Sequence, residues 1–270
     1  MLEIDFSEQS KKILVIGGLF KDIELKGKDH QTNFDSRIGG AAYNVALVLS
    51  ELGYMVYFGT VYPDNYYERL YKPNLKIFPL IYPSEKGFFL YRGKDILGVK
   101  RPTIIKDLFD LKSIFIKENF LAFFTTLELG SNIVNELSYI NSKWKFLDPS
   151  PWFEGDKIET YQQFDFIFPN SMEYDKISKL PFEKSIIKKG VEGISYKDNF
   201  FENKNIGIDK FGNGDLFDAI FISEIISGRN VQKSIETAME VAADFSVSDL
   251  SYESFVKKSK GKRKWSISES

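Results

Sequence analysis

The sequence predicts an α/β fold in which a mostly parallel sheet carries helices on its faces. Short apolar runs rich in β-branched and aromatic residues recur along the chain, and segments with helical periodicity separate several of them. Strands that alternate with helices in this way are typical of parallel sheets. The chain has 270 residues, of which 43% are hydrophobic, so we expect one large domain spanning residues 1–270 with a substantial core.

Several runs have the length and composition of β-strands. They are residues 13–16, 55–58, 75–81, 88–91, 120–124, 144–147, 164–168 and 185–187. The run at 75–81 is a weaker or edge candidate, because Lys76 and Pro79 interrupt it. Two strand-rich segments, 23–38 and 67–101, break the regular order and contain no convincing helix. We therefore expect them to form a small separate sheet over one edge of the main domain.

Helical periodicity is clearest where alanine, valine and leucine recur at positions 42, 45, 46, 49 and 52, with Gly53 as a C-terminal stop. Segment 216–226 is apolar on nearly all sides, which predicts a buried helix that ends by Gly228. Weaker helix candidates are 133–140, 172–177 and 234–247. Six of the eight residues at 257–264 are basic, so we expect 257–270 to be a frayed, solvated tail; a weak polyanion or membrane-surface contact is the alternative.

The composition narrows the classes of function. Lys and Arg total 36 and Asp and Glu total 38, so the chain lacks the basic field of a nucleic-acid binder. With no cysteine and a single histidine, His30, thiolate chemistry and multi-histidine metal sites are excluded. Any metal should be a hard cation on oxygen ligands, such as Mg²⁺. The N-terminus has no signal pattern and no apolar run reaches about 18 residues, so we expect a cytoplasmic protein without membrane or nucleic-acid partners.

A glycine-rich entry to the apolar helix is the most informative segment. Gly212 and Gly214 flank Asn213, and Asp215 follows at once. Such a turn can direct consecutive backbone N–H groups at one point, and the helix adds a partial positive charge there. The result is an anion hole suited to a phosphate, with Asp215 placed to take a proton from an attacking hydroxyl. The plain alternative is that Asp215 merely caps the helix.

A second glycine pair, Gly39 and Gly40, opens the helix that carries Asn44. Glycines let a ligand approach the backbone closely, and Asn44 lies one turn into the helix, where it could orient a substrate hydroxyl. The alternative is a tight helix entry with a polar surface asparagine.

Together the two motifs resemble the ribokinase-like carbohydrate kinases, the PfkB family, over about residues 11–250. The N-terminal signature of the family matches Gly39, Gly40, Asn44, Leu52 and Gly53, and the C-terminal one matches Asp209, Gly212, Gly214, Asp215 and Phe217. Further landmarks follow in family order. They are Asp22 after the first strand, Asp148–Pro149 at a strand end, Asn170 with Glu173, and the turn from Lys189 through Gly190 to Gly193.

The resemblance implies a Rossmann-like αβα sandwich with a small β-strand lid, and ATP with Mg²⁺ as cofactors. It implies catalysis by Asp215 with Gly212, Asn213 and Gly214 as the anion hole. It further implies an acceptor site at Asp22, Gly39, Gly40 and Asn44, and a nucleotide site at Lys189, Gly190, Gly193 and Asp209. Asn170 and Glu173 would hold Mg²⁺ through water. The activity implied is ATP-dependent phosphorylation of a hydroxyl on a sugar or sugar-like molecule, with a possible homodimer formed through the lid.

Three residues depart from the family pattern beside the anion hole: Lys210, Phe211 and Asn213. Some members hold a monovalent cation near the position of Asp209, and we hypothesise that the Lys210 ammonium replaces it, which would make activity insensitive to K⁺; the alternative is an exposed lysine. Two other functions stay open: a nucleoside kinase of the same family, and a catalytically silent relative that binds a ligand or a partner.

Overall fold

The computed structural model describes residues 11–27, 32–61, 70, 72–81, 87–92, 95–101, 115, 117–137, 139–150, 152–203 and 210–262. His30 and Asp209, which the sequence analysis singled out, lie outside these ranges. Among the described residues, no helix has both the length and the apolar character needed to cross a membrane.

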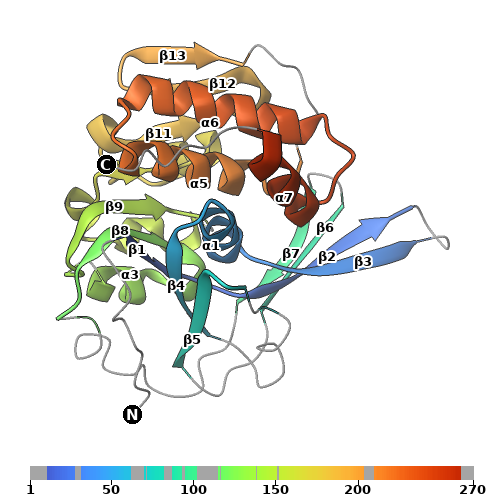
Figure 1. Cartoon of the computed structure of the whole chain (residues 1–270), viewed down its shortest axis with the longest axis horizontal. Helices are drawn as coiled ribbons and strands as arrows, with labels where there is room; N and C mark the ends of the chain where they lie inside the picture. The colour runs from blue at the N-terminus through green and yellow to red at the C-terminus, as the bar shows by residue number, and fades with distance from the viewer. Residues whose placement is uncertain are drawn as a thin grey trace.

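A six-stranded parallel sheet forms the centre of the molecule, in the order β10-β9-β8-β1-β4-β5 (Figure 1). Its strands are β1 (Lys12–Ile16), β4 (Met55–Val61), β5 (Leu75–Ile81), β8 (Phe120–Thr126), β9 (Ser142–Asp148) and β10 (Phe166–Ile167). The register places Ile13 of β1 between Val56 of β4 and Ala122 of β8. The predicted parallel sheet is confirmed.

Side chains of β1 alternate between two apolar cores, one on each face of the sheet. Ile13 and Val15 join the core beneath the helices of one face, and Leu14 and Ile16 join the core of the other. The first core contains residues of α1 (Ala41–Glu51), α5 (Asn213–Ile226), α6 (Val231–Ser246) and α7 (Tyr252–Lys262). The second contains residues of α3 (Ser131–Leu137). This is the expected αβα sandwich.

The chain beyond residue 256 corrects one expectation. Residues 257–262 continue α7 instead of forming part of a frayed tail. Tyr252, Phe255 and Val256 are buried against the first core and hold the helix to the body. Lys257 extends it with an i,i+4 ion pair to Glu253 at 3.2 Å. Residues 263–270 lie outside the described ranges.

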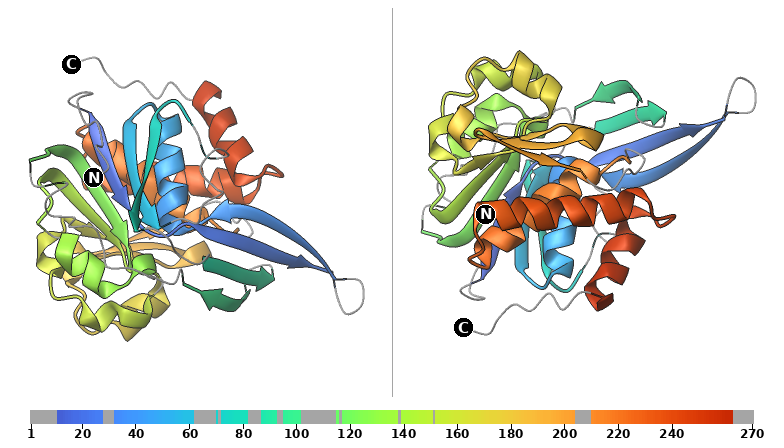
Figure 2. Two further views of the ribbon diagram at one scale, coloured as in Figure 1. Left: turned by 90° about the horizontal axis from the view of Figure 1, so that it is seen from below. Right: turned by 90° about the horizontal axis from the view of Figure 1, so that it is seen from above.

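A separate four-stranded sheet, the lid, has the order β3-β2-β6-β7. Its strands are β2 (Phe20–Lys26), β3 (Asn33–Gly39), β6 (Gly87–Arg92) and β7 (Asp95–Lys100). Figure 2 shows the β2–β3 ribbon reaching away from the body. Lid strands were expected from 67–101, but β5 within that segment pairs in parallel with β4 instead and lies at the edge of the main sheet, as the edge interpretation of 75–81 predicted. Its edge position tolerates Pro79, which has no N–H to donate.

Two strands were not expected from the sequence. β12 (Gly193–Tyr196) and β13 (Asn199–Glu202) pair with β11 (Ile186–Lys188) in a small antiparallel sheet. Parallel bridges from Ile167 to Ser185 and from Asn170 to Lys188 connect β11 to the β10 edge of the main sheet. A short helix, α4 (Ser171–Lys176), begins directly beyond β10. The strand end, the helix and β11 therefore border one side of the same site.

Candidate active site

The N-terminal and C-terminal glycine motifs meet in space although 171 residues separate them. Asn44 Nδ2 on α1 donates a hydrogen bond of 2.6 Å to Asp215 Oδ2 in the first turn of α5. The Tyr252 hydroxyl contacts the Asn44 backbone oxygen at 3.4 Å and supports the junction from α7. The bond from Asn44 to Asp215 therefore joins a residue predicted for the acceptor site to the residue predicted for catalysis.

The N-terminus of α5 has the geometry expected of an anion hole. Gly212 is the N-cap residue with φ 96°, a left-handed conformation that favours glycine. Glycine has no side chain, so no side chain caps the first N–H groups of α5. The first N–H groups of a helix have no partner within the helix, so the start of α5 can bind an anion. One predicted donor is already engaged, because the Asn213 N–H donates to the Lys210 backbone oxygen at 3.0 Å. Burial raises the pKa of Asp215 to about 6, against the lowering effect of the bond from Asn44. The carboxylate is therefore close to the pKa that suits a general base.

Asp22 on β2 faces the same point. Its carboxyl is buried, and neither oxygen has a hydrogen-bond partner. Burial raises the pKa of Asp22 to about 7, the nearby Arg37 lowers it and Asp215 raises it. Gly39 is needed here, because a Cβ at that position would collide with the Asp22 carboxyl. Asp22, Gly39 and Asn44, for which the resemblance implies an acceptor site, are thus brought close to Asp215 or to one another.

Glu128 was not predicted, and it connects the first strand to the entry of α1. Its carboxylate accepts hydrogen bonds from the backbone N–H groups of Gly18 (2.9 Å) and Ala41 (2.6 Å), and from the Thr126 hydroxyl (2.8 Å). Burial raises its pKa to about 8. Glu128 thus takes the place of an N-cap side chain, which Gly40 cannot supply.

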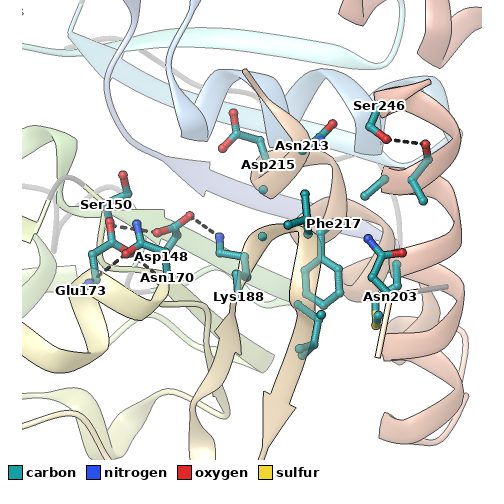
Figure 3. Close-up of a pocket in the computed structure, with 18 of the residues that line it drawn as sticks. Asp148, Ser150, Asn170, Glu173, Lys188, Asn203, Asn213, Asp215, Phe217 and Ser246 are labelled. Carbon is teal, nitrogen blue, oxygen red and sulfur yellow. Dashed lines mark hydrogen bonds and ion pairs between the residues drawn. The ribbon is translucent and has the colours of Figure 1, made fainter. Parts of the chain in front are cut away.

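A cavity of about 480 Å³ opens beside the N-terminus of α5 (Figure 3). Its size is within the range of small-molecule sites. Of the predicted residues, Asn170, Glu173, Gly190, Gly193, Asn213, Gly214 and Asp215 line it. Met239, Ala242 and Ala243 of α6 form an apolar side opposite the charged one, with Ser246 of the same helix also lining the cavity. A polar wall, an apolar wall and a helix N-terminus suit a nucleotide.

Lys188 is the cation of this cavity that the sequence analysis missed. Its ammonium lies 3.0 Å from Asp148 Oδ2 and 2.9 Å from Asp218 Oδ2, and 3.5 Å from where a Cβ of Gly214 would lie. Burial opposes its charge, but the carboxylates outweigh burial and raise the pKa of Lys188 above its usual value. The predicted Lys189 does not line the cavity, and its ammonium lies 5.5 Å from the Phe200 ring. Lys188 is the last residue of β11, whereas Lys189 lies beyond the strand.

Asn170 and Glu173 form a capping box at the start of α4. Asn170 Oδ1 accepts from the Glu173 N–H at 2.9 Å, and Glu173 Oε2 accepts from the Asn170 N–H at 2.8 Å. Burial raises the pKa of Glu173 to about 7. The described residues contain no group of three or more acidic, histidine or cysteine side chains that could hold a metal. Mg²⁺ often keeps its waters and takes only one or two carboxylates with substrate phosphates, so these two residues fit a hydrated ion of that kind.

Lys210 is not an exposed lysine. Its ammonium contacts the carbonyl site, which we define as the backbone oxygens of Phe245, Ser248 and Leu250. The distances to the Phe245 and Leu250 oxygens are both 3.4 Å. The ammonium also lies 4.7 Å from the Phe245 ring. Lys210 thus connects the loop before the anion hole to the C-terminal end of α6.

Phe211, the next departure from the family pattern, contacts the lid. Its ring stacks on Tyr91 of β6, with 4.4 Å between centroids and 6° between planes. Phe89 lies at 6.5 Å. Tyr91 is only 5% exposed. The lid and the anion-hole loop are therefore held together by an aromatic stack.

Comparisons with known proteins give a structural match without a sequence match. No protein-family model and no curated protein matches the chain. A ribokinase from Cryptococcus neoformans var. grubii serotype A, solved in complex with ADP, is 13% identical with a TM-score of 0.72, over 95% of this chain and 100% of its own.

Two other solved structures extend the comparison. An Arabidopsis thaliana ribokinase complexed with ribose and ATP is 16% identical with a TM-score of 0.67, over 93% of this chain and 99% of its own. A Methanocaldococcus jannaschii nucleoside kinase is 19% identical with a TM-score of 0.59, over 94% of this chain and 99% of its own. The order of strands, the lid and these similarities agree: this chain has the ribokinase-like (PfkB) fold.

Proposed function

We propose that this protein transfers the γ-phosphoryl group of ATP to a hydroxyl of a sugar or sugar-like molecule. The observation that carries the proposal is the 2.6 Å hydrogen bond between Asn44 and Asp215, because it fixes a carboxylate at the N-terminus of α5 beside the cavity. The likeness in fold to ribokinases solved with ADP, or with ribose and ATP, supports the proposal.

The protein's own groups suit each part of this transfer. Asp215 accepts the hydroxyl proton while the hydroxyl oxygen attacks the γ-phosphorus and the bond to the bridging oxygen of ADP breaks. The N–H groups of Gly212 and Gly214 would hold the negative charge of the phosphoryl oxygens, and the Asn213 N–H would join them only by leaving the Lys210 oxygen, to which it now donates at 3.0 Å. Mg²⁺, held through water by Asn170 and Glu173, supplies positive charge to the phosphates when bound.

The acceptor would bind between the lid and α1. The two unpartnered oxygens of Asp22 are suited to accept hydrogen bonds from neighbouring hydroxyls of a polyol. The nucleotide would occupy the cavity, with Gly190 and Gly193 at its wall. Roles for Lys189, which lies outside the cavity lining, and for Asp209 remain predictions.

A compact acceptor fits this site better than a nucleoside. Phe211 already stacks on Tyr91 at 4.4 Å, and the Arg37 guanidinium lies 5.5 Å from the Phe211 ring. A base would have to displace one of these contacts in order to stack on the lid aromatics, and a small sugar would not. The catalytically silent alternative does not account for the carboxylate of Asp215, which is set at the anion hole by Asn44.

We also infer that the lid pairs with a second copy of the chain. Phe34 on β3 is 68% exposed, and Ile96 and Leu97 on β7 are 59% and 51% exposed. Large apolar side chains left exposed on the two outer strands of one small sheet favour a contact that covers them.

The test of the proposed function is ADP release with Mg-ATP across a panel of sugars, sugar phosphates, amino-sugar conjugates and nucleosides. We expect turnover with a compound of the sugar class. Turnover confined to nucleosides would favour the alternative kinase. A protein that binds no Mg-ATP would contradict the proposal and favour the silent relative.

A further inference from the structure

Arg37 brings a positive charge from the lid to the anion hole. It lies on β3 directly opposite Asp22 of β2 in the antiparallel register. Its Nε is 3.4 Å from Asp22 Oδ2, an ion pair that lacks the geometry of a hydrogen bond. The guanidinium charge lowers the pKa of Asp215 as well as that of Asp22. Arg37 therefore acts on both carboxylates of the proposed reaction centre.

Two aromatic rings fix the guanidinium in place. It lies 5.5 Å from the ring centre of Phe211 and 5.9 Å from that of Tyr252. Both rings border Gly212: Phe211 precedes it in the chain, and Tyr252 carbons lie 3.1 Å from where a Cβ of Gly212 would lie. The cation is thus positioned against the N-cap of α5 by ring contacts that give Nε and Nη2 no hydrogen-bond partner.

The unused donors are buried. Arg37 Nε and Nη2 are shielded from solvent and have no hydrogen-bond partner. Nη2 lies 3.9 Å from where a Cβ of Gly212 would lie. A buried donor without a partner is costly, so such groups in folded proteins are expected to meet a hydrogen-bond acceptor. A small, negatively charged group suits the role of this hydrogen-bond acceptor, because it would lie between a guanidinium and a helix N-terminus.

We propose that Arg37 donates from Nη2 to the phosphoryl group that is transferred at the N-terminus of α5. The inference rests on the proposed function and adds a catalytic residue supplied by the lid. In the transfer, the acceptor oxygen bonds to phosphorus, the electrons of the broken bond leave with ADP, and the hydroxyl proton passes to Asp215. Arg37 stays protonated throughout and forms no covalent bond; it holds charge on the phosphoryl oxygens.

An acidic group on the sugar or sugar-like substrate could also accept a hydrogen bond from Arg37 Nη2 in place of the transferred phosphoryl group. The position of Nη2 beside Gly212 favours the γ-phosphoryl group, because Gly212 is the N-cap residue of α5, at whose N-terminus the transfer is proposed to take place. The two sources make different demands on nucleotide binding. Only a contact with the γ-phosphoryl group makes Arg37 discriminate a triphosphate from a diphosphate.

The experiment is a calorimetric titration of the whole protein with Mg-ADP and with the Mg complex of the β,γ-imido analogue of ATP. For Arg37→Gln we expect the triphosphate analogue to bind on the order of ten to a hundred times more weakly, with ADP affinity within about twofold of wild type. Arg37→Lys should retain part of the difference because it keeps the charge. Arg92→Gln, which removes an exposed arginine from β6 of the same lid, is the matched control.

Unchanged affinities in Arg37→Gln and Arg37→Lys would overturn the inference. An equal loss for both nucleotides would also overturn it, since Arg37 would then serve the fold or the diphosphate. A wild-type protein that binds neither nucleotide would instead contradict the proposed function itself. Thermal unfolding of each variant shows whether Arg37→Gln is folded, and the lysine variant answers the question if it is not.

Discussion

Replacing Lys210 should create a binding site for a monovalent cation. In the wild-type protein the Lys210 ammonium occupies the carbonyl site formed by Phe245, Ser248 and Leu250. Rings of backbone carbonyls are also the ligands that proteins use for K⁺, and the end of α6 adds negative potential there. Lys210→Ala would leave the three oxygens without their cation. Lys210→Met would remove the charge but keep most of the side-chain volume.

The expected loss of stability follows from the contacts. A hydrogen bond to a charged group contributes about 1.5–3 kcal/mol when buried. Two of the three contacts here are long, at 3.4 Å, and Lys210 is half-buried, so water can replace part of the interaction. We therefore expect Lys210→Ala to lower the free energy of unfolding by about 1–3 kcal/mol, or Tm by roughly 2–10 °C for a chain of this size.

The assay is thermal unfolding in KCl and in tetramethylammonium chloride of equal ionic strength, because the larger cation cannot enter the site. At about ten times its dissociation constant, K⁺ should restore about 1.4 kcal/mol to Lys210→Ala. The wild-type protein and Lys210→Met should show no preference for K⁺. The reasoning would be refuted by a Lys210→Ala protein indifferent to K⁺, or by a wild-type protein whose stability or turnover rises severalfold with K⁺.

Three further predictions concern the carboxylate, the buried lysine and the lid. Since Asp215 has a pKa of about 6 and must be unprotonated to accept a proton, kcat/KM should rise about tenfold from pH 5 to pH 7. Asn44→Ala should move that midpoint to higher pH, and a midpoint that moves down would contradict the assignment. Lys188→Met should cost about 3–5 kcal/mol in chemical denaturation by leaving two buried carboxylates uncompensated, while the control Lys189→Met should cost far less; equal losses would count against the cluster. Light scattering should find a wild-type dimer that Ile96→Lys weakens, and a wild-type monomer would exclude lid pairing.

The sheet and the helices of the body could be predicted because their apolar patterns are strong. Two of the strands, β1 and β8, have buried side chains on both faces, so their sequences are apolar along nearly the whole strand. The helix with apolar residues at 42, 45, 46 and 49 shows an equally clear helical pattern. β5 was harder to assign, since an edge strand tolerates Lys76 and Pro79 and therefore resembles a lid strand in sequence. The sequence predicted a solvated tail for residues 257–262, because the apolar residues that hold α7 to the body lie before the basic run.

The candidate site could be predicted where a backbone conformation requires a particular residue. Gly212 and Gly39 are examples, since one adopts a positive φ and the other lies against the Asp22 carboxyl. Arg37 and Lys188 could not be found in the same way. Their partners lie across a strand pair or on another element, at 2.9 Å for Lys188 with Asp218 and at 3.4 Å for Arg37 with Asp22. Contacts of that kind depend on the tertiary fold and leave no local pattern in the sequence.

Asp215→Asn tests the central claim most directly, once a substrate is found in the panel. Turnover and Mg-ATP affinity should be measured on the same preparation of the variant and of the wild type. We predict that turnover falls roughly 10²–10⁴-fold while the dissociation constant of Mg-ATP stays within about twofold, because the amide cannot accept the hydroxyl proton. A variant that turns over at the wild-type rate would contradict the role of Asp215, and with it the proposed phosphoryl transfer at this site.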